Sequence, residues 1–372
     1  MKKTTLIFLT VMLLLTTLIG CSKQPHTTTP STPLPIPTDA PTKSSISDFN
    51  IVTAPSTKVI LDCDMSYVND DAFALMFLLQ ADRLGYIDLL GVTVSGGNKI
   101  GAVAVNATLL QLEAVGRTDI PVYIGRDEPL LGFNPERAAL TDWPGEVYSN
   151  LDRYITPDDY HNLGDHYIAA WGYSKTNAQI ESASDFMIEQ VSKNPGEITI
   201  LCIGPTTNVA MACLADESFA ANTAGIIYMG GKLSEDASFN WWYDADAVKI
   251  CLESAFPTQI VCTSEISGNM HIPSGFIDNL APYDSSAIAR FFVTHKTIAI
   301  GNKKLWDVAI PAIFMCPELI ATSEKASIAV SVEDATYGQM LFTEDGTEAT
   351  IVSEIHGDDL FILMELLFGT SN

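Results

Sequence analysis

The chain has 372 residues, 47% of them hydrophobic, and its 45 acidic residues against 20 basic ones give a formal net charge of −25. This charge argues against nucleic-acid polymers and anionic lipid surfaces as partners, because both would repel it. Neutral small molecules remain open as ligands, and the length allows one large folded domain.

The N-terminus has the pattern of an export signal. A positive start, Met1-Lys2-Lys3, is followed by an apolar stretch at residues 6–19 that is too short for a comfortable membrane span. The tetrapeptide Leu18-Ile19-Gly20-Cys21 resembles a bacterial lipobox. We therefore expect a signal peptide at 1–20 and a lipid-modified Cys21 that anchors the exported domain to a membrane of the bacterial envelope. An ordinary secretory signal with a coincidental cysteine is the alternative.

A segment rich in threonine, proline and serine follows Cys21. It lacks the apolar side chains that a core needs, so we expect a disordered tether at 21–56 and one folded domain at 57–372. The cysteines beyond Cys21 have apolar neighbours and no C-x-x-C spacing, which favours buried small side chains over a zinc site. Export permits a disulfide among them, and the sequence leaves that open.

Strands and helices alternate along the domain, which predicts an α/β fold with a mostly parallel central sheet and helices on both faces. Short apolar runs predict strands at 58–63, 88–94, 120–124, 198–203, 225–229 and 258–263. Helical periodicity is found at 70–84, 100–116, 181–193, 205–215, 244–254, 306–315 and 357–368. Residues 326–354 alternate in a way that predicts a small antiparallel element near the C-terminus. The aromatic-rich residues 126–177 indicate an insertion or lid beside the site, or else a plain surface excursion.

Four carboxylates lie where the first strand gives way to the first helix: Asp62, Asp64, Asp70 and Asp71. Like charges this close repel one another, and burying one of them without a partner is costly. Carboxylate oxygens suit a hard cation such as Ca2+ or Mg2+, so the cluster predicts a metal site. A solvated helix start is the alternative, since acidic residues also stabilise helix N-termini.

Two further motifs also follow predicted strands. Ser95-Gly96-Gly97-Asn98 comes after the strand at 88–94, and Gly204-Pro205-Thr206-Thr207-Asn208 comes after the strand at 198–203. Ligands of open α/β sheets bind beyond the carboxyl ends of strands. The acidic run and these two motifs are therefore expected to meet at one edge of the sheet.

The acidic run resembles the D-x-D-M-G-x-D-x-D-D signature of the inosine–uridine-preferring nucleoside hydrolase family, with Ser66 in place of its Gly and Val68 in place of its third Asp. Further segments are similar to motifs of that family in the same order: the turn ending at Asn98, residues 198–210, residues 229–231, residues 239–244 and the pair Trp306-Asp307. The likeness spans residues 57–372. It implies a nucleoside-hydrolase-like fold, a homo-oligomer, and hydrolysis of the N-glycosidic bond of ribonucleosides or a related N-ribosyl compound.

The same resemblance implies roles for individual residues. Ca2+ would be held by the carboxylates of Asp64, Asp71 and Asp307 and by the backbone carbonyl of Ile203, and Asp64 would also take the proton of the attacking water. Asp70, Asn98 and Asn240 match residues that hydrogen-bond the ribose, and Asp62 is expected to support the metal ligands. Without their motifs, Asp307 is a plain helix cap and the two asparagines are turn residues.

Two positions depart from the family pattern. Ser238 stands where the family has a Glu that helps to hold the ribose, and Trp306 stands where it has a His that assists the leaving base in part of the family. An indole cannot protonate a base, but it can stack on one, so Trp306 is a candidate substrate contact. His161 or His166 could supply the acid, although a loop histidine is usually just solvated. The departures keep open a second hypothesis, a surface lipoprotein that binds nucleosides or ribose without catalysis, and a third, a structural or adhesive role.

Overall fold

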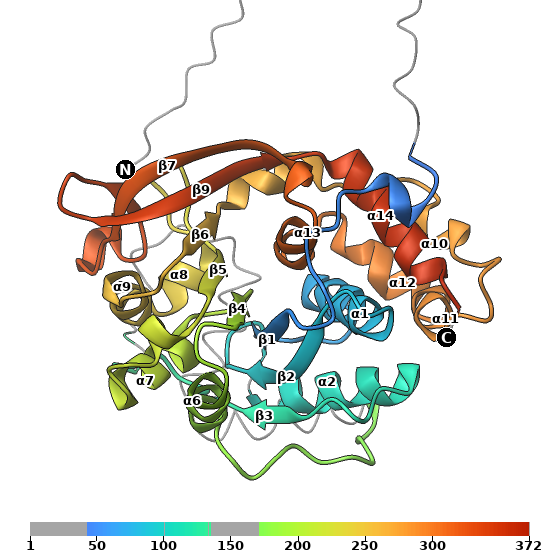
Figure 1. The fold of residues 1–372 in the computed structure, drawn as a ribbon, viewed down its shortest axis with the longest axis horizontal. Coiled ribbons are helices and arrows are strands. Elements are labelled where there is room, and N and C mark those ends of the chain that lie inside the picture. Colours follow the sequence, from blue (N-terminus) through green and yellow to red (C-terminus); the bar gives the residue numbers. More distant parts are fainter. Residues whose placement is uncertain (1–42, 100, 133, 135–170, 372) are drawn as a thin grey trace, which may run out of the picture. The chain divides into compact units, whose positions relative to one another are not determined.

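The computed structural model describes residues 43–99, 101–132, 134 and 171–371, which belong to a compact unit that runs from Lys43 to Asn372 (Figure 1). Its strands are β1 (Lys58–Cys63), β2 (Asp88–Val94), β3 (Val122–Ile124), β4 (Ile198–Cys202), β5 (Gly225–Met229), β6 (Gln259–Cys262), β7 (Ile320–Val330), β8 (Met340–Phe342) and β9 (Thr347–Ile355). Every strand that the apolar runs predicted is present.

These strands form one sheet in the order β3-β2-β1-β4-β5-β6-β9-β7-β8. Neighbouring strands from β3 to β9 are parallel, whereas β7 runs antiparallel to both β9 and β8. Figure 1 shows β7 and β9 side by side as a long pair. The predicted fold is thereby confirmed. Because parallel strands end at the same edge, the segments that follow β1, β2, β4, β5 and β6 all emerge on one side of the sheet.

Helices lie between the strands and cover both faces of the sheet. They are α1 (Asp70–Arg83), α2 (Gly101–Val115), α6 (Ala183–Lys193), α7 (Thr207–Ala215), α8 (Phe239–Tyr243), α9 (Ala245–Glu253), α10 (Phe276–Asn279), α11 (Ala287–Thr294), α12 (Lys296–Ala299), α13 (Ala309–Met315) and α14 (Gly357–Gly369). Every helix that periodicity predicted is present. The sequence did not predict α8 or α10–α12. Of these, α8, α10 and α12 have only four or five residues and complete too few turns to show a clear period, whereas α11 has eight residues and was missed as well.

Side chains alternate between the two faces of β1 and divide the core into two layers. Val59 and Leu61 pack with residues of α1, α2, α11, α13 and α14, whereas Ile60 packs with residues of α6, α7, α8 and α9. All three side chains are fully buried. Burying a side chain of this size contributes roughly 1.5–3 kcal/mol. The strand that leads into the acidic run is therefore held firmly from both sides.

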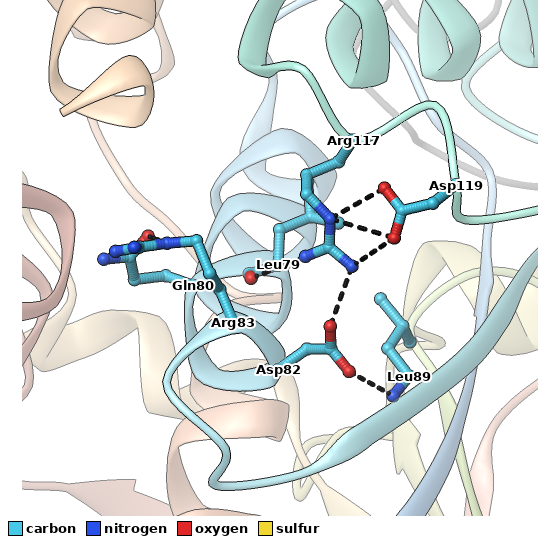
Figure 2. A network of polar contacts seen from close by, with 7 residues as sticks. All are labelled: Leu79, Gln80, Asp82, Arg83, Leu89, Arg117 and Asp119. Atoms are coloured by element: carbon cyan, nitrogen blue, oxygen red, sulfur yellow. Dashed lines mark hydrogen bonds and ion pairs between the residues drawn. The ribbon is translucent and has the colours of Figure 1, made fainter. Parts of the chain in front are cut away.

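Arg117, just after α2, ties α1 to the start of β2 (Figure 2). Its guanidinium donates to the Leu79 carbonyl at 3.0 Å, to Asp82 Oδ2 at 2.7 Å and to Asp119 Oδ2 at 2.8 Å. Asp82 in turn accepts a hydrogen bond from the backbone N–H of Leu89 at 2.9 Å. Since α1 begins with two residues of the acidic run, this network helps to fix the helix that carries them.

The folded unit begins earlier in the chain than residue 57. Phe49 is only 5% exposed, the N–H of Val52 donates to the Met315 carbonyl at 2.9 Å, and the Lys43 ammonium lies 2.7 Å from Glu318. Residues 43–56 therefore pack on the domain, which extends to Lys43. Composition concealed this boundary, because a few apolar side chains are enough to dock a segment that is otherwise polar and rich in serine.

Several expectations fall on other parts of the chain. The signal peptide, Cys21, the tether up to residue 42 and residues 135–170 of the insertion lie outside the described residues. Of the helices in the described ranges, none is both long enough and apolar enough to cross a bilayer. The cysteines from Cys63 to Cys316 are free thiols, and all of them except Cys213 are buried.

Candidate functional site

A cavity of about 490 Å³ opens at the carboxyl edge of the sheet, a volume that suits a small-molecule ligand. It is lined by Asp64, Asp70, Asn98, Ile203, Met229, Gly230, Lys232, Ser238, Phe239, Asn240, Ser264, Ser267, Trp306 and Asp307. These residues follow β1, β2, β4, β5 and β6 or precede α13. The cavity thus gathers every expected metal-binding and ribose-binding residue except Asp71, which lies just behind the lining.

The loop between β1 and α1 presents the acidic run through a strained turn. Val68 has a φ of 58°, in the left-handed region that β-branched residues rarely adopt, and its side chain is fully buried. Asn302 donates to the Val68 carbonyl at 2.9 Å, and the neighbouring Tyr67 ring stacks on Trp171 with centroids 4.9 Å apart. Such strain costs about 1–3 kcal/mol and persists only where the surroundings impose it. Tertiary packing therefore sets the path of this loop.

Three carboxylates meet beside the end of β1. Oxygen atoms of Asp70, Asp71 and Asp307 all lie within 4.8 Å of one another, close enough to share a cation. Asp64, which the sequence placed among the metal ligands in preference to Asp70, lies next to this group: its backbone N–H donates to Asp71 Oδ1 at 3.2 Å. Asn98 links the group from β2: its N–H donates to Asp64 Oδ2 at 2.7 Å, and its side-chain amide donates to Asp71 Oδ2 at 3.3 Å.

Burial opposes ionisation of these carboxylates. The pKa of Asp71 is raised to about 7, mainly by burial away from water and secondly by repulsion from the charge of Asp70. Burial, followed by the charge of Asp71, also holds the pKa of Asp64 well above its usual range. The pKa of Asp307 is raised well above its usual range for the same two reasons, with Asp70 as the nearest charge. A set of oxygen donors that repel one another fits a hard divalent cation, which would relieve the repulsion.

Asp62 lies beneath this cluster and outside the cavity lining. Its Oδ1 accepts hydrogen bonds from Thr93 Oγ1 at 2.7 Å and from the Asn208 amide at 2.9 Å, and Cys202 Sγ lies 3.6 Å from its Oδ2. Burial raises the pKa of Asp62 to about 6, and these donors hold it below the value that burial alone would give. The contacts of the Asp62 carboxylate therefore connect β1 to β2, β4 and α7. This geometry assigns to Asn208 a positioning role that its motif alone did not reveal.

The carbonyl of Ile203 faces the same cavity. Asn240 donates its amide nitrogen to that carbonyl at 2.7 Å and to the Met229 carbonyl at 3.0 Å. A Cβ added to Gly204 would lie 2.7 Å from the backbone nitrogen of Asp64, so only glycine lets the end of β4 approach the acidic run this closely. Because the nitrogen of the Asn240 amide is bonded to the main chain, its Oδ1 is the atom that this side chain can offer to a ligand in the cavity.

The two positions that depart from the family motif bond to the walls of the cavity. The indole N–H of Trp306 donates to the Ser264 carbonyl at 3.2 Å, which fixes the ring at the cavity surface. Ser238 Oγ accepts from the N–H of Gly231 at 2.7 Å. The next residue, Lys232, also lines the cavity, and sequence reasoning missed it although it directly follows the Met-Gly-Gly motif. His161 and His166 lie outside the described residues.

The profile of the inosine-uridine preferring nucleoside hydrolases matches residues 59–361. The chain belongs to this family. The carboxylates at the end of β1, the asparagine after β2 and the Trp306-Asp307 pair before α13 all fall within the matched span.

Relatives of known sequence share about a third of the aligned residues with this nucleoside hydrolase family member. Probable uridine nucleosidase 1 of Oryza sativa subsp. japonica is 31% identical over 210 residues, which are 55% of this chain and 57% of that protein. The pyrimidine-specific ribonucleoside hydrolase RihB of Escherichia coli O157:H7 is 27% identical over 237 residues, which are 59% of this chain and 66% of that protein. The matches thus span between about half and two thirds of these relatives.

Solved structures share the fold more completely. The plant nucleoside hydrolase PpNRh1 has a TM-score of 0.68 and 24% identity, covering 85% of this chain and all of that one. The purine-preferring ribonucleoside hydrolase from Gardnerella vaginalis has a TM-score of 0.68 and 20% identity, covering 84% and 98%. At these identities the likeness establishes the architecture alone, and substrate choice must be argued from the cavity.

Proposed function

We propose that this protein hydrolyses the N-glycosidic bond of ribonucleosides or of a related N-ribosyl compound, releasing the base and ribose. The observation that carries the proposal is the gathering of three carboxylates with Asn98 and Asn240 around one cavity of about 490 Å³; the carboxylates are those of Asp64, Asp70 and Asp307, with Asp71 next to them. Family membership supports the reaction class. A nucleoside is a neutral molecule, which suits a strongly acidic protein.

We propose Ca2+ as the cation of the carboxylate cluster. The carboxylates of Asp64, Asp71 and Asp307 and the carbonyl of Ile203 would hold it, since oxygen donors of this kind suit hard cations. When bound, Ca2+ lowers the pKa of a coordinated water and orients vicinal hydroxyls. Asp70 belongs to the same cluster and lines the cavity, where it can accept hydrogen bonds from the ribose.

Asp64 is the proposed general base. Its Oδ2 accepts a hydrogen bond from the Asn98 N–H at 2.7 Å, which fixes the carboxylate in one orientation for proton transfer. As the water oxygen bonds to C1′ of the sugar, Asp64 takes the water proton. The C1′–N bond breaks, and its electron pair passes to the nitrogen of the base. Asn98 and the Oδ1 of Asn240 bind the sugar hydroxyls during this step.

Trp306 is proposed to bind the base. Its ring lines the cavity and is oriented by the bond to Ser264, so its face can stack on a purine or pyrimidine. Aromatic pairs of this kind contribute about 1 kcal/mol. Because its N–H is already donated to Ser264, Trp306 acts by stacking and supplies no proton.

The test incubates the protein with a panel of ribonucleosides, once in calcium and once in chelator. Chromatography then measures the free base that is released. Asp64→Asn should abolish turnover, whereas Glu324→Gln, an exposed acid on β7, should leave it unchanged. Full activity of the Asp64 variant would refute the assignment of the base. Calcium binding without release of base from any ribonucleoside would refute the ribonucleosidase.

A second candidate function is nucleoside or ribose binding without catalysis. It is motivated by Ser238 and Trp306, whose polar groups are bonded to the main chain at Gly231 and Ser264. They stand where the family has a Glu that helps to hold the ribose and a His that assists the leaving base. Isothermal titration that shows nucleoside binding, together with no base release in the chromatographic assay, would favour this candidate over the hydrolase.

We also propose that the domain is exported and lipid-anchored through Cys21. The lipobox-like sequence supports this, and the threonine- and proline-rich segment after it would act as the tether. Cys21→Ala should release the protein from the membrane fraction, and retention of the variant there would refute the anchor. A homo-oligomer is proposed in addition, and light scattering of the purified protein would report its mass.

A further inference from the structure

The cavity has two chemically different ends. Asp64 and Asp70 follow β1 and Asn98 follows β2, whereas Lys232 follows β5 and Ser264 follows β6. Asp307, before α13, joins the carboxylates at the β1 end through Asp70 and Asp71. The sheet order places β4 between β1 and β5, so the acidic end and the lysine end lie on opposite sides of the Ile203 carbonyl, which follows β4. A ligand whose sugar rests on the carboxylates therefore extends its other end toward Lys232.

The backbone on both sides of Lys232 is fixed. On one side, the N–H of Gly231 donates to Ser238 Oγ at 2.7 Å, and the Gly231 carbonyl accepts from the N–H of Ser264 at 3.1 Å. On the other side, the N–H of Leu233 donates to Glu265 Oε1 at 3.1 Å. Gly231 has a φ of +75°, which a residue with a Cβ rarely adopts. The backbone of the turn that carries Lys232 is therefore held in one conformation.

The same turn is also linked to Trp306 through Ser264. Ser264 donates its N–H to Gly231 and accepts the indole N–H of Trp306 at 3.2 Å, so one residue anchors both the lysine turn and the aromatic ring. The Lys232 side chain is 28% exposed, and its ammonium lies 3.7 Å from Asp236, whose side chain is 79% exposed. An ion pair this exposed contributes little, so the pair with Asp236 does not hold the ammonium away from a ligand.

From this geometry we infer that Lys232 is a catalytic residue that stabilises the departing base, an inference that rests on the proposed hydrolysis. As the C1′–N bond breaks, the electron pair leaves with the base, and negative charge spreads to its carbonyl oxygens and ring nitrogens. The Lys232 ammonium donates a hydrogen bond to such an acceptor and gives the base its proton. The proton that Asp64 takes from water returns the enzyme to its starting charge, so water and nucleoside yield ribose and neutral base.

The lining of the cavity makes this assignment specific. Among the described residues that line it, Lys232 is the one basic side chain, and Asp64, Asp70 and Asp307 occupy the sugar end. Trp306 has already given its only N–H to Ser264. The substrates favoured are thus nucleosides whose base presents a carbonyl oxygen or an unprotonated ring nitrogen on the side away from the ribose.

Two substrates with different leaving groups test this role. The purified protein in calcium is given a natural ribonucleoside and p-nitrophenyl β-D-ribofuranoside, whose nitrophenolate leaves without help. Lys232→Met should lower kcat on the nucleoside about 100-fold, the scale of general acid catalysis, and change kcat on the nitrophenyl riboside by less than about threefold. Lys232→Arg keeps the charge and should recover part of the loss.

Lys249→Met is the matched control, since Lys249 is an exposed lysine on α9, outside the cavity lining, and pairs with Glu253. It should leave both rates unchanged. The thermal midpoint and its rise with calcium show whether each variant is folded. If the Lys232→Met protein loses both activities equally, or neither, the leaving-group role is overturned while the hydrolase stands. If the wild-type protein cleaves neither substrate, the proposed function fails and the inference falls with it.

Discussion

In chelator, without a cation on the carboxylate cluster, the stability of this protein should fall as pH rises. Asp71 carries the argument: burial and the charge of Asp70 raise its pKa from 3.8 to about 7. Between these values the folded state binds more protons than the unfolded chain. Stability is therefore fully present below the unfolded pKa and is lost progressively until the pH passes the folded pKa.

The size of this effect follows from the two pKa values of Asp71. Relative to a pH below both values, titration of Asp71 lowers the free energy of unfolding by about 2 kcal/mol at roughly pH 5 and by about 4 kcal/mol at roughly pH 7. About 2 kcal/mol of stability is therefore lost between these two pH values. Burial also raises the pKa values of Asp64 and Asp307, which adds loss in the same direction. Calcium, bound by the charged forms, should restore more stability at the higher pH.

Urea denaturation in chelator, followed by tryptophan fluorescence at several pH values, measures the effect. Asp71→Asn removes the ionisable group, so its stability should fall less over the same pH range than that of the wild type. Glu324→Gln, exposed on β7, should follow the wild type. The expected pH dependence is refuted if the stability of the chelated wild-type protein stays constant or rises over this range and the Asp71 variant behaves identically. Burial would then not raise the pKa of Asp71 in the folded state.

Substitutions at Arg117, Trp306 and Asn208, the first two with a comparison variant, probe the frame of the site and its base-binding end. Arg117→Met should lower the free energy of unfolding, measured by urea denaturation, by about 2–4 kcal/mol, because it leaves acceptors on α1 unpaired. Asp119→Asn, at the exposed end of the same network, should lower it by only about 0.5 kcal/mol. Trp306→Ala should raise KM for a nucleoside about fivefold through lost stacking, and Trp306→Phe should restore most of the affinity; an unchanged KM in the alanine variant would argue against base binding. Asn208→Ala should weaken calcium binding about 10- to 100-fold in titration, since it removes a donor from Asp62, and unaltered affinity would show that Asp62 does not support the ligands.

The architecture could be predicted well because its signals are local. The apolar runs at 58–63 and 198–203 alternate with helical periods, and this alternation leaves few topologies other than a parallel sheet covered on both faces. The short helices α10–α12 and the docking of residues 43–56 were not predicted, because each depends on a few contacts with distant parts of the chain.

The site divides in the same way. The acidic run and Asn98 follow strands, so the rule that parallel strands end at one edge already placed them together. The bond from Trp306 to Ser264, the attachment of Asn240 to the Ile203 carbonyl and the entry of Lys232 into the cavity had no comparable sequence signal.

The sequence by itself thus determined the sheet and the edge at which the acidic run and Asn98 emerge, since periodicity and residue chemistry act over a few neighbouring positions. Tertiary structure alone decided which polar atoms the carboxylates and asparagines bond and which side chains form the far end of the cavity. Those contacts join the ends of β4, β5 and β6 to residues before α13, and their geometry is set by packing across the whole domain.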